Sequence, residues 1–310
     1  MATLPASGAQ HTLRAGGYRA DIATIGASVR CLQHEGRDII VPFDANEVRP
    51  AMRGALLAPW PNRIADGRYV FAGTQHQLPI NEIATRTASH GLVAWQNFTV
   101  ADEQADSLVL TATIEPQPGY PWRIRVDVVF GLTADGLRQE VSATNLSDDA
   151  APFGVGAHPY LLAGPADREA VDTWRLQIPA ERVLLVSADR MLPMERFDVI
   201  DHEAGRYDFR TARPLGSAAL NNAYTGLARD ERGMACVRVM HDGVGVEAVW
   251  DEGTPWVQIY TADESAGGDF RHGIAGEPRT CPPDAFNSGT DRAVIEAGAT
   301  FTAGWAIRAV

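Results

Sequence analysis

Apolar and polar side chains alternate along most of the stretch Trp122-Arg123-Ile124-Arg125-Val126-Asp127-Val128-Val129-Phe130. Successive side chains of an extended strand point to opposite faces, which puts on one face the apolar residues Trp122, Ile124, Val126, Val128 and Phe130. The charged residues of the stretch fall on the other face: Arg123, Arg125 and Asp127. This pattern predicts a strand with one face in the protein core and the other in solvent.

The same strand character recurs between turn-forming residues in five more segments: Leu108 to Ile114, Leu137 to Thr144, Val237 to Met240, Val244 to Trp250 and Trp256 to Thr261. No segment offers a convincing amphipathic helix of three turns, which argues against alternating strands and helices. The segment 164–172 is expected to be a long polar surface loop. No break in composition marks a domain boundary, so we expect one all-β, antiparallel domain over residues 1–310 with its sheet edges covered.

Composition narrows the range of partners. The 310 residues carry a formal net charge of −12 and no cluster of Lys and Arg, which argues against a nucleic acid and favours a neutral ligand. The N-terminal residues have neither a basic nor an apolar leader region, and no run of about 18 uncharged apolar residues occurs. We therefore expect a cytoplasmic protein with no membrane partner. Cys31, Cys236 and Cys281 have the spacing of neither a disulfide framework nor a zinc site and are expected to be ordinary thiols.

Two residues suited to proton transfer lie in segments rich in Gly and Pro. His158 lies in Gly154-Val155-Gly156-Ala157-His158-Pro159-Tyr160, and Glu277 lies in Gly276-Glu277-Pro278-Arg279-Thr280-Cys281-Pro282-Pro283. One group can give a proton and the other can take one, and the backbone constraint in such segments fixes the direction of the chain. They are far apart in the sequence, so only the tertiary fold can bring them together.

Another histidine, His90 in Ala88-Ser89-His90-Gly91-Leu92, has a similar tight-turn context. Either His90 or His158 alone is more readily interpreted as structural than as catalytic, because local context is a weak indication of a role. The other histidines are expected to be solvated imidazoles on the surface or in surface loops: His11, His34, His76, His202, His241 and His272.

Several common catalytic motifs are absent from the sequence. The histidine spacing does not fit the HExxH zinc motif, and a third zinc ligand has no obvious supplier. The GxSxG elbow of serine hydrolases, the GxGxxG fingerprint and the P-loop do not occur. General acid and base catalysis without a metal or a covalent intermediate remains.

Two further segments carry groups that can hydrogen-bond to hydroxyls. Arg63, in Pro59-Trp60-Pro61-Asn62-Arg63-Ile64, can donate a fixed fork of hydrogen bonds to a sugar, although a structural ion pair explains it equally well. Gln258 and Tyr260 share one face of the strand predicted over Trp256 to Thr261. The Gln258 amide can donate to and accept from hydroxyls, and its alternative role is to brace the strand.

Together, these residues make the chain resemble the aldose 1-epimerase family, the galactose mutarotase-like proteins, and its bacterial branch in particular. The matching pieces occur in the family's order and span most of the chain: Asn62-Arg63-Ile64, His90-Gly91, His158-Pro159-Tyr160, Val257-Gln258-Ile259-Tyr260-Thr261, and Glu277-Pro278 with Pro283-Asp284-Ala285-Phe286. The resemblance implies a large antiparallel β-sandwich, the galactose mutarotase-like supersandwich. It also implies an open cleft that holds a free aldose and interconverts its α and β anomers.

The resemblance assigns a role to each site residue. Glu277 corresponds to the general base, His158 to the general acid, and His90 to a group that assists at the ring oxygen. The positions that bind sugar hydroxyls or shape the pocket correspond to Asn62, Arg63, Tyr160 and Gln258. Attraction between carboxylate and imidazolium is expected to favour the charged form of each. The reaction needs no cofactor, because it involves neither a redox change nor a group transfer.

The chain departs from the family at one position. The family usually has an aspartate in a Leu-Asp-x-x-Phe/Tyr-Thr segment, whereas the matching stretch here is Leu220-Asn221-Asn222-Ala223-Tyr224-Thr225. The amide of Asn221 can bind hydroxyls, but it has no charge and accepts fewer hydrogen bonds than a carboxylate. The identity of the sugar is therefore left open.

Three alternatives remain beside a mutarotase of free aldoses. A catalytically silent sugar-binding or regulatory protein would keep the cleft. A hexose-phosphate epimerase of the same superfamily would need a cationic pocket, for which Arg63, Arg271 and Arg279 are candidates. A glycosidase fits less well, because it normally uses two carboxylates. In each case the expected partner is a small carbohydrate, and the protein is expected to be a monomer or a homodimer.

Overall fold

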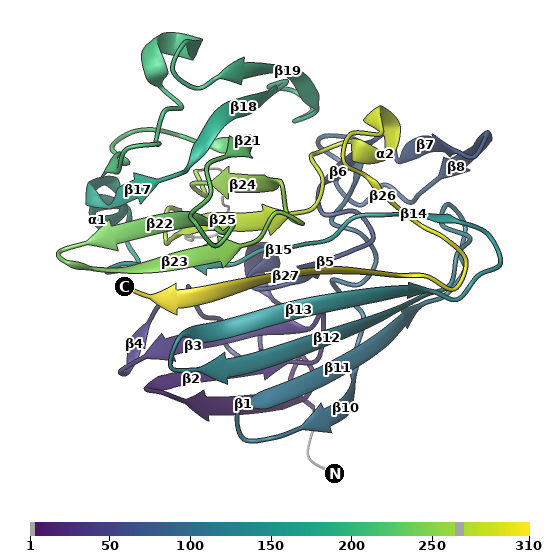
Figure 1. Cartoon of the computed structure of the whole chain (residues 1–310), viewed down its shortest axis with the longest axis horizontal. Helices are drawn as coiled ribbons and strands as arrows, with labels where there is room; N and C mark the ends of the chain where they lie inside the picture. Colours follow the sequence, from purple (N-terminus) through teal and green to yellow (C-terminus); the bar gives the residue numbers. More distant parts are fainter. Residues whose placement is uncertain (1–3, 264–269) are drawn as a thin grey trace.

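The computed structural model describes residues 4–263 and 270–310. Two large antiparallel sheets dominate it, one with nine strands and one with eight (Figure 1). The main hydrophobic cluster contains buried side chains from both sheets, among them Val126 of the first and Val257 of the second. The antiparallel all-β fold predicted from the alternation of side chains is confirmed.

The nine-stranded sheet has the order β10-β11-β12-β13-β27-β23-β22-β17-β20. Its strands are β10 (Thr99–Glu103), β11 (Ser107–Ile114), β12 (Ile124–Thr133), β13 (Gly136–Asn145), β27 (Thr300–Ala309), β23 (Val244–Trp250), β22 (Ala235–His241), β17 (Arg175–Gln177) and β20 (Arg213–Pro214). The last strand in the chain, β27, lies between β13 and β23 and pairs with both (Figure 1). It therefore joins strands from the two halves of the sequence.

The eight-stranded sheet has the order β19-β18-β21-β24-β25-β15-β5, and β16 also pairs with β25. Its strands are β19 (Pro193–Asp198), β18 (Ala180–Val186), β21 (Asn221–Leu227), β24 (Trp256–Tyr260), β25 (Ile274–Arg279), β15 (Gly156–Ala157), β5 (Leu56–Leu57) and β16 (Tyr160–Leu161). Most of the candidate site residues lie on these strands or in the loops that follow them.

Smaller elements complete the described structure. A four-stranded sheet contains β1 (Gln10–Ala15), β2 (Tyr18–Ala23), β3 (Ser28–His34) and β4 (Arg37–Asp38). Three strand pairs are β6 (Arg63–Ala65) with β9 (Thr87–Ser89), β7 (Arg68–Phe71) with β8 (Thr74–Gln77), and β14 (Ala151–Phe153) with β26 (Ala293–Ile295). The helical turns are η1 (Pro50–Met52), α1 (Arg168–Thr173), η2 (His202–Gly205) and α2 (Ala285–Ser288).

The strand predicted around Val126 is β12. Its inward-facing side chains, Ile124, Val126, Val128 and Phe130, are each 0% exposed, whereas Arg125 on the opposite face is exposed. The other five predicted strands correspond to β11, β13, β22, β23 and β24. The strand pattern therefore identified five strands of the nine-stranded sheet and one of the eight-stranded sheet, while β27 and β25 were not predicted.

The segment 164–172 differs from its prediction. It was expected to be a loop throughout, but α1 begins at Arg168, where Oδ1 of Asp167 accepts a hydrogen bond of 2.8 Å from the Ala170 amide. This N-cap satisfies one of the free amides of the first turn, which allows a short helix to form. In the described ranges, no helix has both the length and the apolar character needed to cross a bilayer.

Strand register in the eight-stranded sheet positions several candidate residues. Gln258 of β24 pairs directly with Glu277 of β25, and Tyr260 pairs with Asn221 of β21. Directly paired residues of an antiparallel sheet project to the same face, as do residues two apart on one strand. All four side chains therefore lie on one face of the sheet.

Candidate functional site

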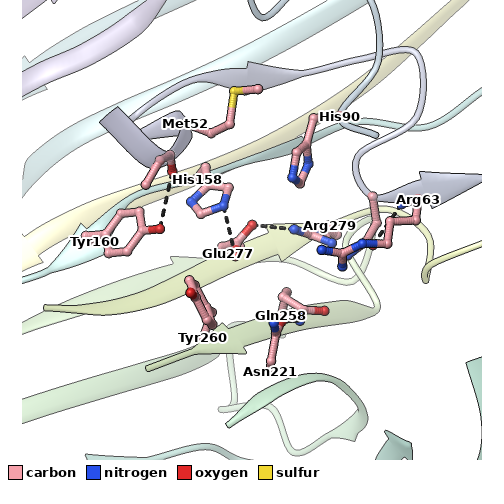
Figure 2. Close-up of a pocket in the computed structure, with 12 residues that line it drawn as sticks. Met52, Arg63, His90, His158, Tyr160, Asn221, Gln258, Tyr260, Glu277 and Arg279 are labelled. Carbon is pink, nitrogen blue, oxygen red and sulfur yellow. Dashed lines mark hydrogen bonds and ion pairs between the residues drawn. The ribbon is translucent and has the colours of Figure 1, made fainter. Parts of the chain in front are cut away.

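A cleft of about 300 Å³ lies over this face of the eight-stranded sheet (Figure 2). The residues that line the cleft are Ala51, Met52, Asn62, Arg63, His90, His158, Tyr160, Asn221, Gln258, Tyr260, Glu277 and Arg279. The lining includes every residue predicted for the site, although they come from distant parts of the sequence. The fold thus brings the residues predicted for the site together around one cleft.

The carboxylate of Glu277 is held between an imidazole and a guanidinium. Glu277 lies on β25 and is 1% exposed. Its Oε1 lies 3.5 Å from Nε2 of His158, and its Oε2 accepts a hydrogen bond from Nη2 of Arg279 (Figure 2). Arg279 reaches the carboxylate because it is two residues further along the same strand and so projects to the same face.

The peptide on both sides of the His158 side chain is fixed by hydrogen bonds. Its amide donates to the Ala55 carbonyl at 3.1 Å, and its carbonyl accepts from the Gly54 amide at 2.8 Å. The imidazole stacks on the ring of Tyr160 with a centroid separation of 5.2 Å, and the Tyr160 hydroxyl donates to the Ala51 carbonyl at 3.2 Å. These contacts aim Nε2 of His158 at Glu277.

His90 lies in the tight turn that its glycine neighbour predicts. His90 has a φ of 66° and Gly91 a φ of 73°, and a Cβ on Gly91 would collide with the Ala58 carbonyl. Nδ1 of His90 lies 3.1 Å from the Pro61 carbonyl, which can only accept, so Nδ1 carries the proton. In the neutral ring Nε2 is then an acceptor, which suits a sugar hydroxyl better than the ring oxygen.

Burial dominates the titration of the two central groups. Desolvation, followed by the positive charge of Arg279, lowers the pKa of His158 to about 3. Desolvation also raises the pKa of Glu277, against the opposing charge and hydrogen bond of Arg279. The expectation that mutual attraction favours both charged forms is therefore wrong, because removal from water disfavours each charge more strongly.

Arg63 forms the structural ion pair that was one interpretation of its motif, and it also lines the cleft. Its Nε and Nη2 donate to Oε1 of Glu82 at 3.0 and 2.8 Å. The side chain of Asn62 turns back on the chain, since its Oδ1 accepts from the Arg63 amide at 2.8 Å. The ion pair therefore orients Arg63 at the edge of the cleft.

On the same sheet face as Glu277, the side-chain amides of Gln258 and Asn221 bind each other. Nε2 of Gln258 donates to Oδ1 of Asn221 at 2.9 Å. In the described part of the chain, Oε1 of Gln258 is buried and has no hydrogen-bond donor. The pair therefore presents an unsatisfied acceptor beside Glu277, and Asn221 occupies the position where the family usually has an aspartate.

Four lining residues were not chosen as site residues from the sequence: Ala51, Met52, Tyr260 and Arg279. Tyr260 and Arg279 carry a usable signal, because each is two residues from a predicted site residue on a strand. The turn containing Ala51 has no such signal, since its positive φ of 43° is visible only in the structure. Arg271 is not part of the lining and instead forms ion pairs with Asp172 and Asp263.

The other histidines are less exposed than expected. His11, His34, His76, His202, His241 and His272 are half-buried rather than fully solvated. Aromatic stacking explains part of their burial, as for His76, whose ring centroid lies 4.9 Å from that of Tyr69.

The three cysteines are free thiols, and burial raises the pKa of each to about 12. Among the residues that the structure describes, no group of three His, Cys, Asp or Glu side chains is placed to bind a metal ion.

The fold and the cleft define an antiparallel β protein with a polar, acid-and-base site that opens to solvent. A family model described as aldose 1-epimerase matches residues 9–308, and the chain belongs to that family. The uncharacterized protein YihR of Escherichia coli is 35% identical over 294 residues, 94% of this chain and 90% of YihR. Galactose mutarotase of Bos taurus is 23% identical over 267 residues, 79% of this chain and 75% of the relative.

Solved structures show the same fold. A GalM/aldose epimerase homologue from C. elegans aligns with a TM-score of 0.84 at 17% identity, covering 97% of this chain and 99% of the other. A putative aldose 1-epimerase from Escherichia coli K12 aligns with a TM-score of 0.82 at 24% identity, with the same coverage. Family membership supports a sugar epimerase or mutarotase, an enzyme of the isomerase type.

Proposed function

We propose that the protein is an aldose 1-epimerase that interconverts the α and β anomers of a free aldose. The observation that carries the proposal is the pair formed by Oε1 of Glu277 and Nε2 of His158, 3.5 Å apart in the wall of an open cleft. An acid and a base at this separation can serve two oxygens bonded to one carbon, as the ring and anomeric oxygens of an aldose are.

Ring opening assigns one proton transfer to each group. Glu277 takes the proton of the anomeric hydroxyl while His158 donates one to the ring oxygen, which breaks the bond between C1 and the ring oxygen. The C1–C2 bond of the open chain rotates, and the same groups in reversed roles close the ring on the other face of C1. Protons balance over the cycle, so the chemistry requires no cofactor.

The pKa shifts make the charged forms of His158 and Glu277 more reactive but less populated. A buried imidazolium with a pKa of about 3 is a strong acid, and a carboxylate whose pKa is raised is a stronger base than usual. Burial makes the charged pair rare, but when that pair forms, the imidazolium gives its proton readily and the carboxylate takes a proton readily. The other predicted residues bind hydroxyls around this pair: Asn62, Arg63, His90, Tyr160, Asn221 and Gln258.

Polarimetry of freshly dissolved α-anomers, repeated across a panel of aldoses, tests the proposal. We expect faster equilibration with the protein than without it, and loss of most of the acceleration in Glu277→Gln and His158→Asn. His241→Asn is a matched control, because this half-buried histidine lies outside the lining of the cleft. Absence of acceleration with every aldose would contradict the proposal, and sugar binding without acceleration would favour a silent binding protein.

A phosphorylated hexose is the second candidate substrate, because Arg63 and Arg279 both line the cleft. Each of these arginines already contacts a carboxylate, Glu82 and Glu277, which reduces the charge available to a phosphate. The free sugar is therefore the preferred candidate. Comparing glucose with glucose 6-phosphate separates the two, since a preference for the phosphorylated sugar would reverse this ranking.

A further inference from the structure

We propose that Arg279 is a positioning residue for Glu277: it occupies Oε2, leaves Oε1 as the basic oxygen, and keeps the buried carboxylate ionised. The inference rests on the proposed function, because it concerns the base of that reaction. It starts from the hydrogen bond that Nη2 of Arg279 donates to Oε2 of Glu277 (Figure 2).

The contact between the Arg279 guanidinium and the Glu277 carboxylate is buried. Arg279 and Glu277 are each 1% exposed, so solvent has little access to either charge. Within residues 4–263 and 270–310, Nε and Nη1 of Arg279 are buried and have no acceptor. The carboxylate of Glu277 is thus the acceptor that the Arg279 guanidinium binds. The contact is strongest when this carboxylate is charged.

The backbone holds Arg279 in place for this contact. Arg279 and Glu277 both lie on β25, and Gly156 of the neighbouring strand β15 pairs with Arg279. A Cβ on Gly156 would lie 2.8 Å from Cγ of Arg279, so the glycine leaves room for the arginine stem. Sheet pairing and this close approach together fix where the guanidinium lies relative to Glu277.

The arrangement distinguishes the two carboxylate oxygens. Oε2 is engaged by a cationic N–H donor, whereas Oε1 faces Nε2 of His158 at 3.5 Å. A proton removed from a sugar hydroxyl therefore goes to Oε1, beside the imidazole that must supply the other proton. Without Arg279 the carboxylate could rotate and present either oxygen.

Other titratable groups face Glu277 but do not replace Arg279. Those that line the cleft are His90 and His158 from loops, Arg63 at the start of β6, Tyr160 on β16 and Tyr260 on β24. Arg63 also lowers the pKa of Glu277, but its effect is smaller than that of Arg279. Both histidines are held neutral by burial, which lowers their pKa values. Arg279 is therefore the main charge that opposes desolvation of the carboxylate.

The test is the pH dependence of kcat/KM for anomer exchange. An adjacent Arg typically lowers a carboxyl pKa by about 1–3 units, so Arg279→Met should raise the pKa of Glu277 by about this amount. Since the reactive pair is charged and the pKa of His158 lies below that of Glu277, Glu277 sets the alkaline limb of the profile, which should move up by about 1–3 pH units. Activity that the native protein loses above this limb should then persist to higher pH in the variant. Arg279→Lys keeps the charge and should move the limb less. Arg138→Met removes a charge from an exposed side chain and should leave the limb unchanged.

Carbon-13 NMR of protein labelled at the Glu carboxyl carbons provides a readout that does not depend on turnover. With the signal of Glu277 assigned from Glu277→Gln, we expect an ionised carboxylate at pH 7 in the native protein and a higher pKa in Arg279→Met. Equal pKa values in the two proteins would overturn the inference. If Arg279→Met does not fold, the native titration decides, since a neutral Glu277 at pH 7 would overturn it. If the native protein has no epimerase activity, the proposed function is refuted instead. The carbon-13 signal of Glu277 still tests its contact with Arg279 in that case.

Discussion

The neutral, buried state of His158 makes the stability of the protein depend on pH. Its pKa is about 3 in the folded protein, compared with 6.5 for an ordinary histidine. Between about pH 3 and pH 6.5, His158 is therefore protonated in the unfolded chain and neutral in the folded protein. Because the folded pKa is depressed, the stabilisation is complete above pH 6.5 and is lost as the pH falls towards 3.

The size of the effect follows from the pKa difference. One pKa unit corresponds to about 1.36 kcal/mol, so at pH 5, about 1.5 units below the unfolded pKa, the loss is about 2 kcal/mol. Below pH 3 the loss approaches about 5 kcal/mol. His90 acts in the same direction, because its pKa is also lowered by burial. Glu277 acts in the opposite direction, because its raised pKa stabilises the folded protein as the pH falls.

Urea unfolding at pH 7.5 and pH 5 measures the contribution of His158. We compare the protein with its His158→Asn variant, both carrying Glu277→Gln so that the coupled carboxyl does not contribute. The free energy of unfolding should fall between the two pH values by about 2 kcal/mol more with histidine than with asparagine. Equal losses in the two proteins would refute the claim that His158 is held neutral.

Three substitutions test other contacts of the cleft. Glu82→Gln removes the charged partner of Arg63, and we expect KM to rise by about fivefold, equivalent to about 1 kcal/mol, with a smaller change in kcat. An unchanged KM in polarimetric assays would contradict the orienting role of Glu82. Gly91→Ala places a Cβ against the Ala58 carbonyl at a φ of 73°. It should lower the free energy of unfolding by at least about 1–3 kcal/mol. A urea midpoint equal to that of the native protein would contradict this expectation. Asn221→Asp adds a carboxylate to the wall and should change the ratios of kcat/KM among aldoses by about fivefold, because charged hydrogen bonds are stronger by about 1 kcal/mol. Identical ratios would show that Asn221 does not contact the sugar.

The sequence predicted six of the strands and the residues that line the cleft for different reasons. Strands such as β12 repeat a period of two, which is a local property of the chain and can be read directly. The cleft residues are distant in sequence, and only the order of motifs shared with the family related His158 to Glu277. Their direct contact is a property of the fold, since β15 and β25 are neighbours in the same sheet.

Other features of the site could not be predicted because they depend on surroundings. The segment around Glu277 was interpreted as rich in turn formers, but Pro278 lies within β25, and so the position of Arg279 on the same face was not recognised. The direction of both central pKa shifts was predicted incorrectly, because the loss of water around His158 and Glu277 is not encoded in their neighbours along the chain. The exposure of the remaining histidines was overestimated for the same reason.

The central position of β27 in the nine-stranded sheet has a consequence for biosynthesis. Until Thr300–Ala309 leaves the ribosome, β13 and β23 each present an unpaired edge with open backbone donors and acceptors. Nascent chains that end before this strand therefore expose two unpaired strand edges at once, which favours self-association. The nine-stranded sheet is therefore completed only after the strands on both sides of β27 have been synthesised.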